Sequence, residues 1–243
     1  AHSSNNISAF LMKELGPEAL ARMMRQMGVR SHIDEVYSLC VGPVEVSVFD
    51  MVSAYNTFPS HGTYITPQYV ARITDGDGRE LGSFTTQKRE AISEQTAYLM
   101  VNLMSGVINE GTGSRLRSVY GLRGEIAGKT GTTNDNSDGW FIGYTPNITA
   151  GVWVGGEDRQ VHFNSLALGS GSNMSLPIWG IWMKKCLADP SIGWSMENDS
   201  FLAPSTGIPG LDCEKDGIFL GGYNQENAAG VDEEKQEEDY YFN

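Results

Sequence analysis

The sequence predicts an α+β fold in which helices flank an antiparallel sheet. Apolar residues recur every three or four positions through most of the first 110 residues, which is the period of a helix. From Gly124 the apolar residues alternate instead, which is the period of a strand. A last helical segment, from about Leu176 to Leu187, follows the strands. This order of elements is typical of helices packed on an antiparallel sheet.

Two helices are predicted in the first 60 residues. The first has Pro17 in its first turn and ends at Gly28, and the second begins at Ser47, where Asp50 completes a box-like cap, and stops at Pro59. The side chains expected to be buried in the first helix are Leu20, Met23, Met24 and Met27, which we interpret as core and not as a cofactor site. In the second helix they are Met51, Ala54, Tyr55 and Phe58.

A hairpin and a long helix follow. The hairpin is expected over Tyr69–Leu81, with its turn at Asp75–Gly78. A calcium loop at this turn is rejected because it would need further acids and a Glu at its twelfth position. Ser93 caps the long helix, and Gly111 closes it. The buried stripe of this helix is expected to hold Ala97, Met100, Val101, Met104 and Ile108.

Alternating residues then predict a three-stranded antiparallel meander. Its first strand contains the segment GKTG, residues 128–131, and a turn at 145–147 joins the other two. Residues expected to share a face are Trp140, Ile142 and Tyr144 on one strand, and Ile148, Ala150, Val152 and Val154 on the next. We expect Trp140 and Trp153 to be core residues and not platforms for sugars. The final helix would pack on the sheet through Ile178, Ile181, Trp182 and Cys186.

Composition excludes several classes of protein. The 243 residues, with 40% hydrophobic and 10% aromatic side chains, suffice for one large domain or two smaller ones that share a cleft, and they exclude a disordered chain. The net charge of −13 and the absence of a Lys/Arg-rich run argue against nucleic acid as a partner. The last 13 residues, VDEEKQEEDYYFN, are predicted to be a solvated acidic tail.

Cysteine and histidine residues predict neither a metal site nor a cofactor. Three Cys and four His residues are widely spaced and form no CxxC or HExxH pattern. A disulfide between Cys186 and Cys213 stays open, for an oxidising compartment. The chain contains no apolar run of 18 residues and begins with AHSSNN instead of an initiator Met. We therefore expect it to be a piece of a longer protein, with any membrane anchor outside this chain.

The segment GKTG has the composition of an anion- and peptide-binding strand. Because Gly128 and Gly131 have no Cβ, another chain can approach the backbone closely on both sides of Lys129. Thr130 and Thr132 add hydroxyls that can hold a carboxylate, and a strand edge offers N–H and C=O groups to an extended peptide. Three residues recur by chance, however, so the alternative of an ordinary strand-end lysine needs a second motif to be rejected.

The second motif is a Ser-x-Asn at the start of the chain, just before an amphipathic helical start at Ile7. It fits two registers, Ser3 with Asn5 or Ser4 with Asn6. With both motifs in place, the chain resembles the C-terminal part of the transpeptidase domain of class A, bifunctional penicillin-binding proteins. That family usually leaves one residue between the Asn and the next apolar residue, which favours Ser3 and Asn5.

Further segments extend the resemblance over residues 1–188, in family order. One is similar to the family's Gly-x-x-Glu-Val-Ser-Pro stretch but has Val48 in place of Pro. The segments are VGPVEVSVFDMVSAYNTFPSHGTYITP, QTAYLMVNLMSGVINEGTGSRLR, GKTGTTNDNSDGWFIGYTPNITAGVWVGGED and LPIWGIWMKKCL. The resemblance implies a β-lactamase/transpeptidase-like fold with an additional helical subdomain, incomplete in this chain. Residues 189–243 match no family segment, and we assign them to a C-terminal extension with the acidic tail.

The resemblance also implies acyl transfer. In the family, a Ser attacks the D-Ala-D-Ala carbonyl of a peptidoglycan stem peptide, and an amine of a second stem then takes the acyl group; β-lactams bind at the same site. Ser3 would relay protons, Asn5 would orient the substrate amide, and Lys129 would hold Ser3 and attract the substrate carboxylate. Thr130 and Thr132 would bind that carboxylate, with the Thr132 N–H as half of the oxyanion hole and Gly131 letting the substrate lie flat.

The family nucleophile lies in an SxxK motif that this chain lacks. None of the residues three positions before a lysine is Ser; they are Phe10, Thr85, Ile126, Ile181, Trp182, Asp212 and Asp232. We expect the SxxK segment, together with the first two strands of the family's five-stranded sheet, in a preceding part of the same protein. The isolated chain is then expected to be inactive and to lack part of its core. The implied location is the periplasmic side of the bacterial inner membrane.

Two other functions stay open at this point. Serine β-lactamases and D,D-carboxypeptidases share KTG and an SxN-like element, with water in place of the amine acceptor. A non-catalytic penicillin-binding sensor or scaffold module would keep the fold and the peptide groove. The segments GTGSRLR and GWFIGYTPN resemble class A penicillin-binding proteins more closely.

Overall fold

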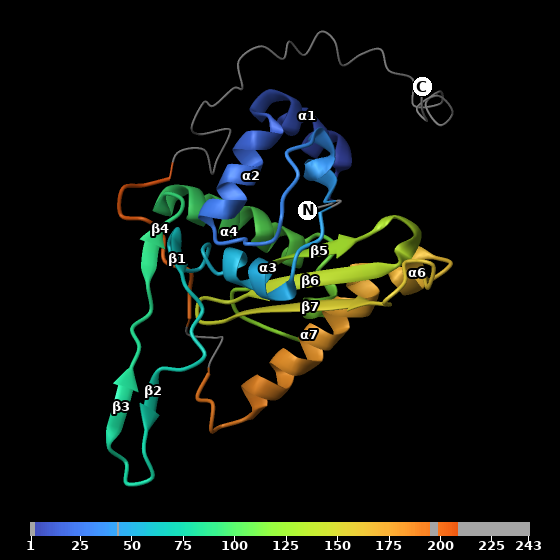
Figure 1. The fold of residues 1–243 in the computed structure, drawn as a ribbon. Helices are drawn as coiled ribbons and strands as arrows, with labels where there is room; N and C mark the ends of the chain where they lie inside the picture. Colours follow the sequence, from blue (N-terminus) through green and yellow to red (C-terminus); the bar gives the residue numbers. More distant parts are fainter. Residues whose placement is uncertain (1–2, 43, 195–198, 209–243) are drawn as a thin grey trace, which may run out of the picture. The chain divides into compact units, whose positions relative to one another are not determined.

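Three antiparallel strands form the central sheet, in the order β5–β6–β7 (Figure 1). The computed structural model of the chain describes residues 3–42, 44–194 and 199–208. The strands are β5 (Ala127–Thr132), β6 (Asp138–Tyr144) and β7 (Thr149–Gly155). Lys129 lies opposite Ile142, and Trp140 lies opposite Trp153. The predicted meander is confirmed, and GKTG lies on β5, which has β6 on one side and no strand of the described residues on the other.

One face of the sheet is covered by α7 (Gly171–Ala188). Phe141 packs edge-on against Trp179, with 5.4 Å between ring centroids, and the Trp179 indole N–H donates to the carbonyl of Ala150 at 3.1 Å. Both aromatic side chains are fully buried. The other buried members of this core are Ile108, Leu116, Leu122, Ile126, Leu176 and Met183.

The opposite face packs on α3 (Val48–Tyr55) and α4 (Glu94–Asn109). A buried cluster joins Tyr144 and Ala127 of the sheet to Val101 and Met104 of α4. Both predicted N-caps are present: Ser47 accepts from the Asp50 N–H at 3.0 Å, and Ser93 accepts from the Thr96 N–H at 3.2 Å. The predicted stripe of α4 is confirmed, with Met100 partly buried and its other four members buried.

The N-terminal part consists of α1 (Asn5–Leu15), α2 (Pro17–Gln26) and the 3-10 turn η1 (Tyr37–Val41). These elements, the segment between α2 and η1, and Ala54 of α3 share a second core, which includes Met12, Ala21, Met27, Val29, Ile33, Leu39 and Ala54. In contrast, α1 exposes most of its apolar side chains, among them Ile7, Phe10, Leu11 and Leu15. This stripe has no covering element among the described residues.

Short strands and turns complete the chain. The predicted hairpin is present as β2 (Arg72–Thr74) and β3 (Glu80–Ser83), and the Asp75 carboxylate accepts from the Asp77 and Arg79 N–H groups in its turn. β1 (Thr63–Ile65) pairs with β4 (Lys88–Glu90). The remaining elements are α5 (Arg115–Ser118), η2 (Asn134–Asn136) and α6 (Leu166–Gly169). Within the described parts of the chain, no helix is both long and apolar enough to cross a bilayer.

Three predictions about burial are wrong. In α7 the buried stripe is Leu176, Trp179, Gly180 and Met183, whereas the predicted Ile178, Ile181 and Trp182 are substantially exposed and Cys186 is only partly buried. Apolar residues occur all around this helix, so periodicity could not identify the inner face. In α2, Ala21 is buried, whereas Met23 is 43% exposed. On the sheet, Trp140 is partly buried, and Trp153 is 41% exposed and is therefore not a core residue.

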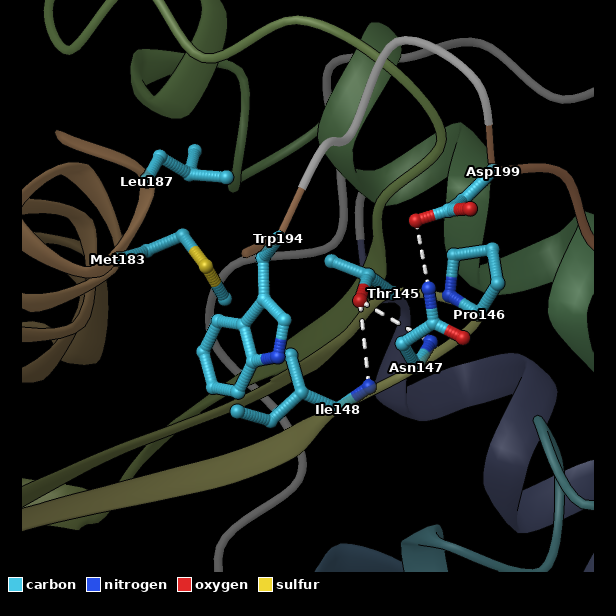
Figure 2. A pocket seen from close by; sticks show the side chains of 8 residues that line it. All are labelled: Thr145, Pro146, Asn147, Ile148, Met183, Leu187, Trp194 and Asp199. Carbon is cyan, nitrogen blue, oxygen red and sulfur yellow. Dashed lines mark hydrogen bonds between the residues drawn. The ribbon is translucent and has the colours of Figure 1, made fainter. Parts of the chain in front are cut away.

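Residues 199–208 pack back on the sheet and on α4. The Phe201 ring lies 5.7 Å from Tyr144, and Gln95 donates to the Thr206 hydroxyl at 3.1 Å. The Asn147 amide donates to the Asp199 carboxylate at 2.5 Å, and both residues line a small cavity together with Trp194 (Figure 2). The predicted division at residue 188 stays a prediction, although the compact unit extends to Ile208. The acidic tail and Cys213 lie outside the described residues. The possible disulfide between Cys186 and Cys213 therefore also lies outside them.

Candidate active site

The site is centred on a hydrogen bond between the two motifs, which lie 126 positions apart. Lys129 Nζ donates to Ser3 Oγ at 2.8 Å and to the Thr130 carbonyl at 2.7 Å. The strand β5 fixes the Lys129 backbone by pairing it with Ile142. The contact anticipated from the sequence between the first hydroxyl and this ammonium is therefore present.

The Lys129 side chain is partly buried and has no acidic partner within the described parts of the chain. Burial lowers the pKa of Lys129 below its ordinary value. Among the described residues, no carboxylate forms an ion pair with it. A partly buried ammonium that donates to a hydroxyl and a carbonyl gains stability when an anion approaches. The site therefore favours a ligand with a negative charge.

Ser3 is held in an unusual backbone conformation. Its φ of 56° lies in the left-handed region, which non-glycine residues adopt infrequently and which is enriched at functional sites. Ser4 is the N-cap residue of α1, but its side chain makes no capping hydrogen bond. Because Ser3, and not Ser4, contacts Lys129, the geometry favours the register with Ser3 and Asn5.

The structure does not bring Asn5 into this contact. Asn5 is the first residue of α1 and is exposed, and its side-chain amide makes no hydrogen bond within the described residues. Its predicted role with the substrate amide is therefore not tested by any contact.

Two glycines allow β5 to lie close to its neighbours. A Cβ on Gly128 would lie 2.6 Å from the Ile142 carbonyl, and a Cβ on Gly131 would lie 3.1 Å from the Cβ of Trp140. The Thr133 N–H donates to the Asp138 carbonyl on the β6 side at 3.3 Å. Because N–H groups alternate in direction along a strand, the Thr132 N–H points to the open edge of β5. This edge can pair with an extended peptide.

Both threonine hydroxyls of β5 already have partners in the structure, which the sequence did not predict. Thr130 Oγ1 lies 2.7 Å from Thr112 Oγ1, and Thr130 is only 9% exposed. Thr132 Oγ1 accepts from the Gly171 N–H at 3.0 Å, at the start of α7. A hydroxyl has one hydrogen to donate and two lone pairs, so Thr132 can still donate to a carboxylate, and Thr130 can do so when it accepts from Thr112. In the sequence, Thr112 stands out only as part of the segment GTGSRLR, which resembles the family.

The small cavity of Figure 2 is not this site. It has a volume of about 10 Å³, and it lies at the β6–β7 turn between Thr145 and Ile148. The strand register places this turn beside Ala127, at the opposite end of β5 from Thr132. A space of that size holds no more than one water molecule.

Comparison with known proteins identifies the family. The family model described as "Penicillin binding protein transpeptidase domain" matches residues 1–158. Penicillin-binding protein 1A of Aquifex aeolicus is 33% identical over 184 residues, which cover 76% of this chain and 24% of that protein. Penicillin-binding protein 1A of Neisseria meningitidis is 28% identical over 232 residues, which cover 89% of this chain and 28% of that protein.

Solved structures agree in fold. The crystal structure of penicillin-binding protein 1A from Haemophilus influenzae superposes with a TM-score of 0.72 at 21% identity, covering 84% of this chain and 34% of that one. The penicillin-binding protein PonA1 from Mycobacterium tuberculosis gives a TM-score of 0.66 at 27% identity, covering 81% of this chain and 56% of that one.

The fold is of the β-lactamase/transpeptidase type. The chain belongs to the penicillin-binding protein transpeptidase domain family. It spans about a quarter of the length of the two curated relatives named above.

Proposed function

We propose that this chain is the C-terminal portion of a D,D-transpeptidase domain, which crosslinks peptidoglycan stem peptides through a serine acyl-enzyme. The observation that carries the proposal is the 2.8 Å hydrogen bond between Ser3 and Lys129, which joins the two motifs of the family. The family match and the names of the relatives, which are penicillin-binding proteins, support β-lactams as a second class of ligand.

Substrate binding in this proposal uses the uncompensated ammonium and the open strand edge. A stem peptide that ends in D-Ala-D-Ala carries one terminal carboxylate, and Lys129 attracts it. The peptide backbone pairs with the free edge of β5, and Gly131 lets it lie flat. Thr130 and Thr132 donate their hydroxyl hydrogens to the carboxylate, and Asn5 orients the amide of the peptide. The Thr132 N–H stabilises the oxyanion that forms at the carbonyl under attack.

Proton transfer uses Ser3. Because Ser3 Oγ accepts from the Lys129 ammonium, its own hydrogen is available to the leaving amine. The nucleophilic oxygen forms a bond to the D-Ala carbonyl carbon, the C–N bond breaks, and the departing D-Ala amine takes the proton from Ser3. The proton lost by the nucleophile restores the Ser3 hydroxyl, so the relay is balanced.

The nucleophile itself is proposed to lie in an SxxK segment outside this chain, in the same protein. Two observations support this partner: the chain contains no SxxK, and α1 exposes an apolar stripe that begins four residues after Ser3. A packed segment that covers the stripe would remove apolar surface from water, worth about 25 cal/mol per Å². We place the protein on the periplasmic side of the bacterial inner membrane, held by an anchor that also lies outside this chain.

A labelled penicillin tests the proposal. The longer protein, with the preceding segment, is expected to gain one covalent penicilloyl group that deacylates slowly, and this chain alone is expected to gain none. An adduct on the isolated chain, or none on the longer protein, contradicts the proposal.

A second assay separates the alternatives. With a D-Ala-D-Ala peptide and an amine acceptor, a transpeptidase gives the crosslinked product, a carboxypeptidase gives the hydrolysed peptide, and a non-catalytic module gives neither. Rapid turnover of penicillin would instead identify a β-lactamase.

A further inference from the structure

The turn that follows α4 reaches the strand β5 through one hydroxyl. Thr112 Oγ1 lies 2.7 Å from Thr130 Oγ1, and neither hydroxyl has another recorded hydrogen-bond partner in the described residues. Thr112 belongs to the segment GTGSRLR, which has no part in the chemistry described above. Its contact is with a side chain of the proposed carboxylate site.

The backbone around Thr112 is fixed on both sides. The Gly111 and Gly113 N–H groups both donate to the Val107 carbonyl of α4, at 3.1 and 3.0 Å. Gly113 is buried, and a Cβ there would lie 2.7 Å from the Ile108 side chain. The turn therefore holds the Thr112 backbone beside β5, and the Thr112 hydroxyl contacts Thr130 from there.

The same turn is also tied to the start of α7. The Arg115 guanidinium donates to the Ser172 carbonyl at 3.2 Å. On the other side of this junction, the Gly171 N–H donates to Thr132 Oγ1 at 3.0 Å. The turn, β5 and the first turn of α7 are thus joined by hydrogen bonds on one face of the sheet, the face onto which Thr130 and Thr132 project by strand alternation.

The direction of the hydrogen bonds decides whether the Thr130 and Thr132 hydroxyls can donate to a ligand. A backbone N–H can only donate, so the bond from Gly171 occupies a lone pair of Thr132 and leaves the Thr132 hydrogen free. If Thr112 likewise donates to Thr130, the Thr130 hydrogen is also free. Two hydroxyls two residues apart on one strand then offer donors to the two oxygens of one carboxylate.

We infer that Thr112 is a positioning residue that orients the Thr130 hydroxyl as a donor to the ligand carboxylate. The inference rests on the proposed function and adds to it a residue that does not touch the reacting atoms. Without the Thr112 hydroxyl, the Thr130 hydroxyl loses its donor partner and rotates freely. The effect falls on ligands with a free carboxylate and spares ligands without one.

The test uses the longer protein with its SxxK segment and compares Thr112→Val, Thr112→Ser and the control Ser114→Ala. Ser114 lies in the same turn, and its side chain makes no capping hydrogen bond. The measurement is the second-order rate of acylation by benzylpenicillin and by its methyl ester, in which the carboxylate is blocked.

The expected result is that Thr112→Val slows acylation by benzylpenicillin about tenfold and changes the rate with the ester by less than about twofold. Thr112→Ser keeps a hydroxyl and is expected to restore most of the rate, while Ser114→Ala stays at the wild-type rate. The double variant Thr112→Val/Thr130→Val is expected to be no slower than Thr130→Val alone.

Equal losses with the acid and the ester would overturn the inference, because they indicate a structural role only; so would an unchanged rate. Thr112→Ala replaces the valine variant if the latter lowers the melting temperature. If penicillin does not acylate the wild-type protein at all, the proposed function itself is contradicted. If penicillin acylates the wild type and Thr112→Val at the same rate, only the inference about Thr112 is contradicted.

Discussion

The helices α7 and α1 both carry many large apolar residues, but they differ in how many of these residues are buried. In α7, Trp179 and Met183 are at most 1% exposed, whereas in α1 the residues Ile7, Phe10 and Leu15 are between 57% and 70% exposed. The sheet and α7 share a packed core. The apolar stripe of α1, which begins four residues after Ser3, has no covering element in the part of the chain that the structure describes. The proposal places the segment with the nucleophile there.

The largest effect on the free energy of unfolding is expected in the core between the sheet and α7. Trp179→Ala removes a fully buried side chain that packs on Phe141 and donates to Ala150, so we expect a loss of about 3 to 5 kcal/mol in the free energy of unfolding. Urea unfolding of this chain measures it. A loss of less than about 1 kcal/mol would mean that the sheet half is not the packed core that the comparison requires.

A smaller loss is expected where α7 meets the site. A Cβ on Gly171 would lie 2.2 Å from the Gly131 carbonyl and 2.5 Å from the Trp140 carbonyl, so Gly171→Ala forces the helix away from β5. We expect a loss of about 2 to 3 kcal/mol. The control is Gly106→Ala in α4, which meets nothing within 4 Å and is expected to stabilise by up to about 1 kcal/mol. Equal effects of the two substitutions would contradict the close contact.

The N-terminal half depends on a carboxylate and is expected to weaken in acid. Burial raises the pKa of Asp50, but hydrogen bonds from the Ser31 hydroxyl and from the Ser31 and Arg30 N–H groups outweigh it and hold the pKa below its ordinary value. This stabilisation is complete above the unfolded pKa, about 3.9, and is lost as the pH falls through the lower folded pKa.

Unfolding of Asp50→Asn measures this contribution. The substitution is expected to cost about 1 to 2 kcal/mol at pH 7 and to cost less at acidic pH, since the wild type then loses the same charge. A cost that does not change between pH 7 and acid would show that the ionised carboxylate is not what joins α3 to the loop at residues 30–31.

The smallest effect is expected on the uncovered stripe. Phe10→Ala changes a side chain that is 57% exposed, so in this chain we expect a change below about 0.5 kcal/mol. In the longer protein the same substitution is expected to destabilise by at least about 1 kcal/mol, because the ring is then buried. If Phe10→Ala has the same small effect in this chain and in the longer protein, then no segment of the longer protein covers α1. This result would contradict the proposed packing of a preceding segment on α1.

Local sequence patterns predicted several elements correctly. The meander, the stripe of α4 and the hairpin at Asp75 follow from alternation, helical spacing and turn residues, which act locally. The inner face of α7 could not be predicted in this way, because its apolar residues surround the helix and only the packing partners decide which of them are buried. The exposure of Trp153 likewise depends on which helix reaches that end of the sheet.

Some residues of the candidate site were also indicated by the sequence, whereas others were found only in the structure. The pair of Ser3 and Lys129 was accessible from the sequence only through the family resemblance, since no local pattern joins residues so far apart. Thr112 and Gly171 were missed because their contacts with Thr130 and Thr132 arise from tertiary packing. The hydroxyl of Thr132 illustrates the limit: its residue type predicted an anion site, but its bond to the start of α7 needed coordinates.

The most direct test of the account replaces each of two neighbouring serines by alanine, one at a time, in the longer protein. Ser3 contacts Lys129 and Ser4 does not, although the two residues are adjacent and both can form a Ser-x-Asn motif. We expect Ser3→Ala to reduce the rate of acylation by penicillin by about 100-fold or more, and Ser4→Ala to change it by less than about threefold. A large loss with Ser4→Ala and none with Ser3→Ala would contradict the placement of the proton relay at the 2.8 Å contact.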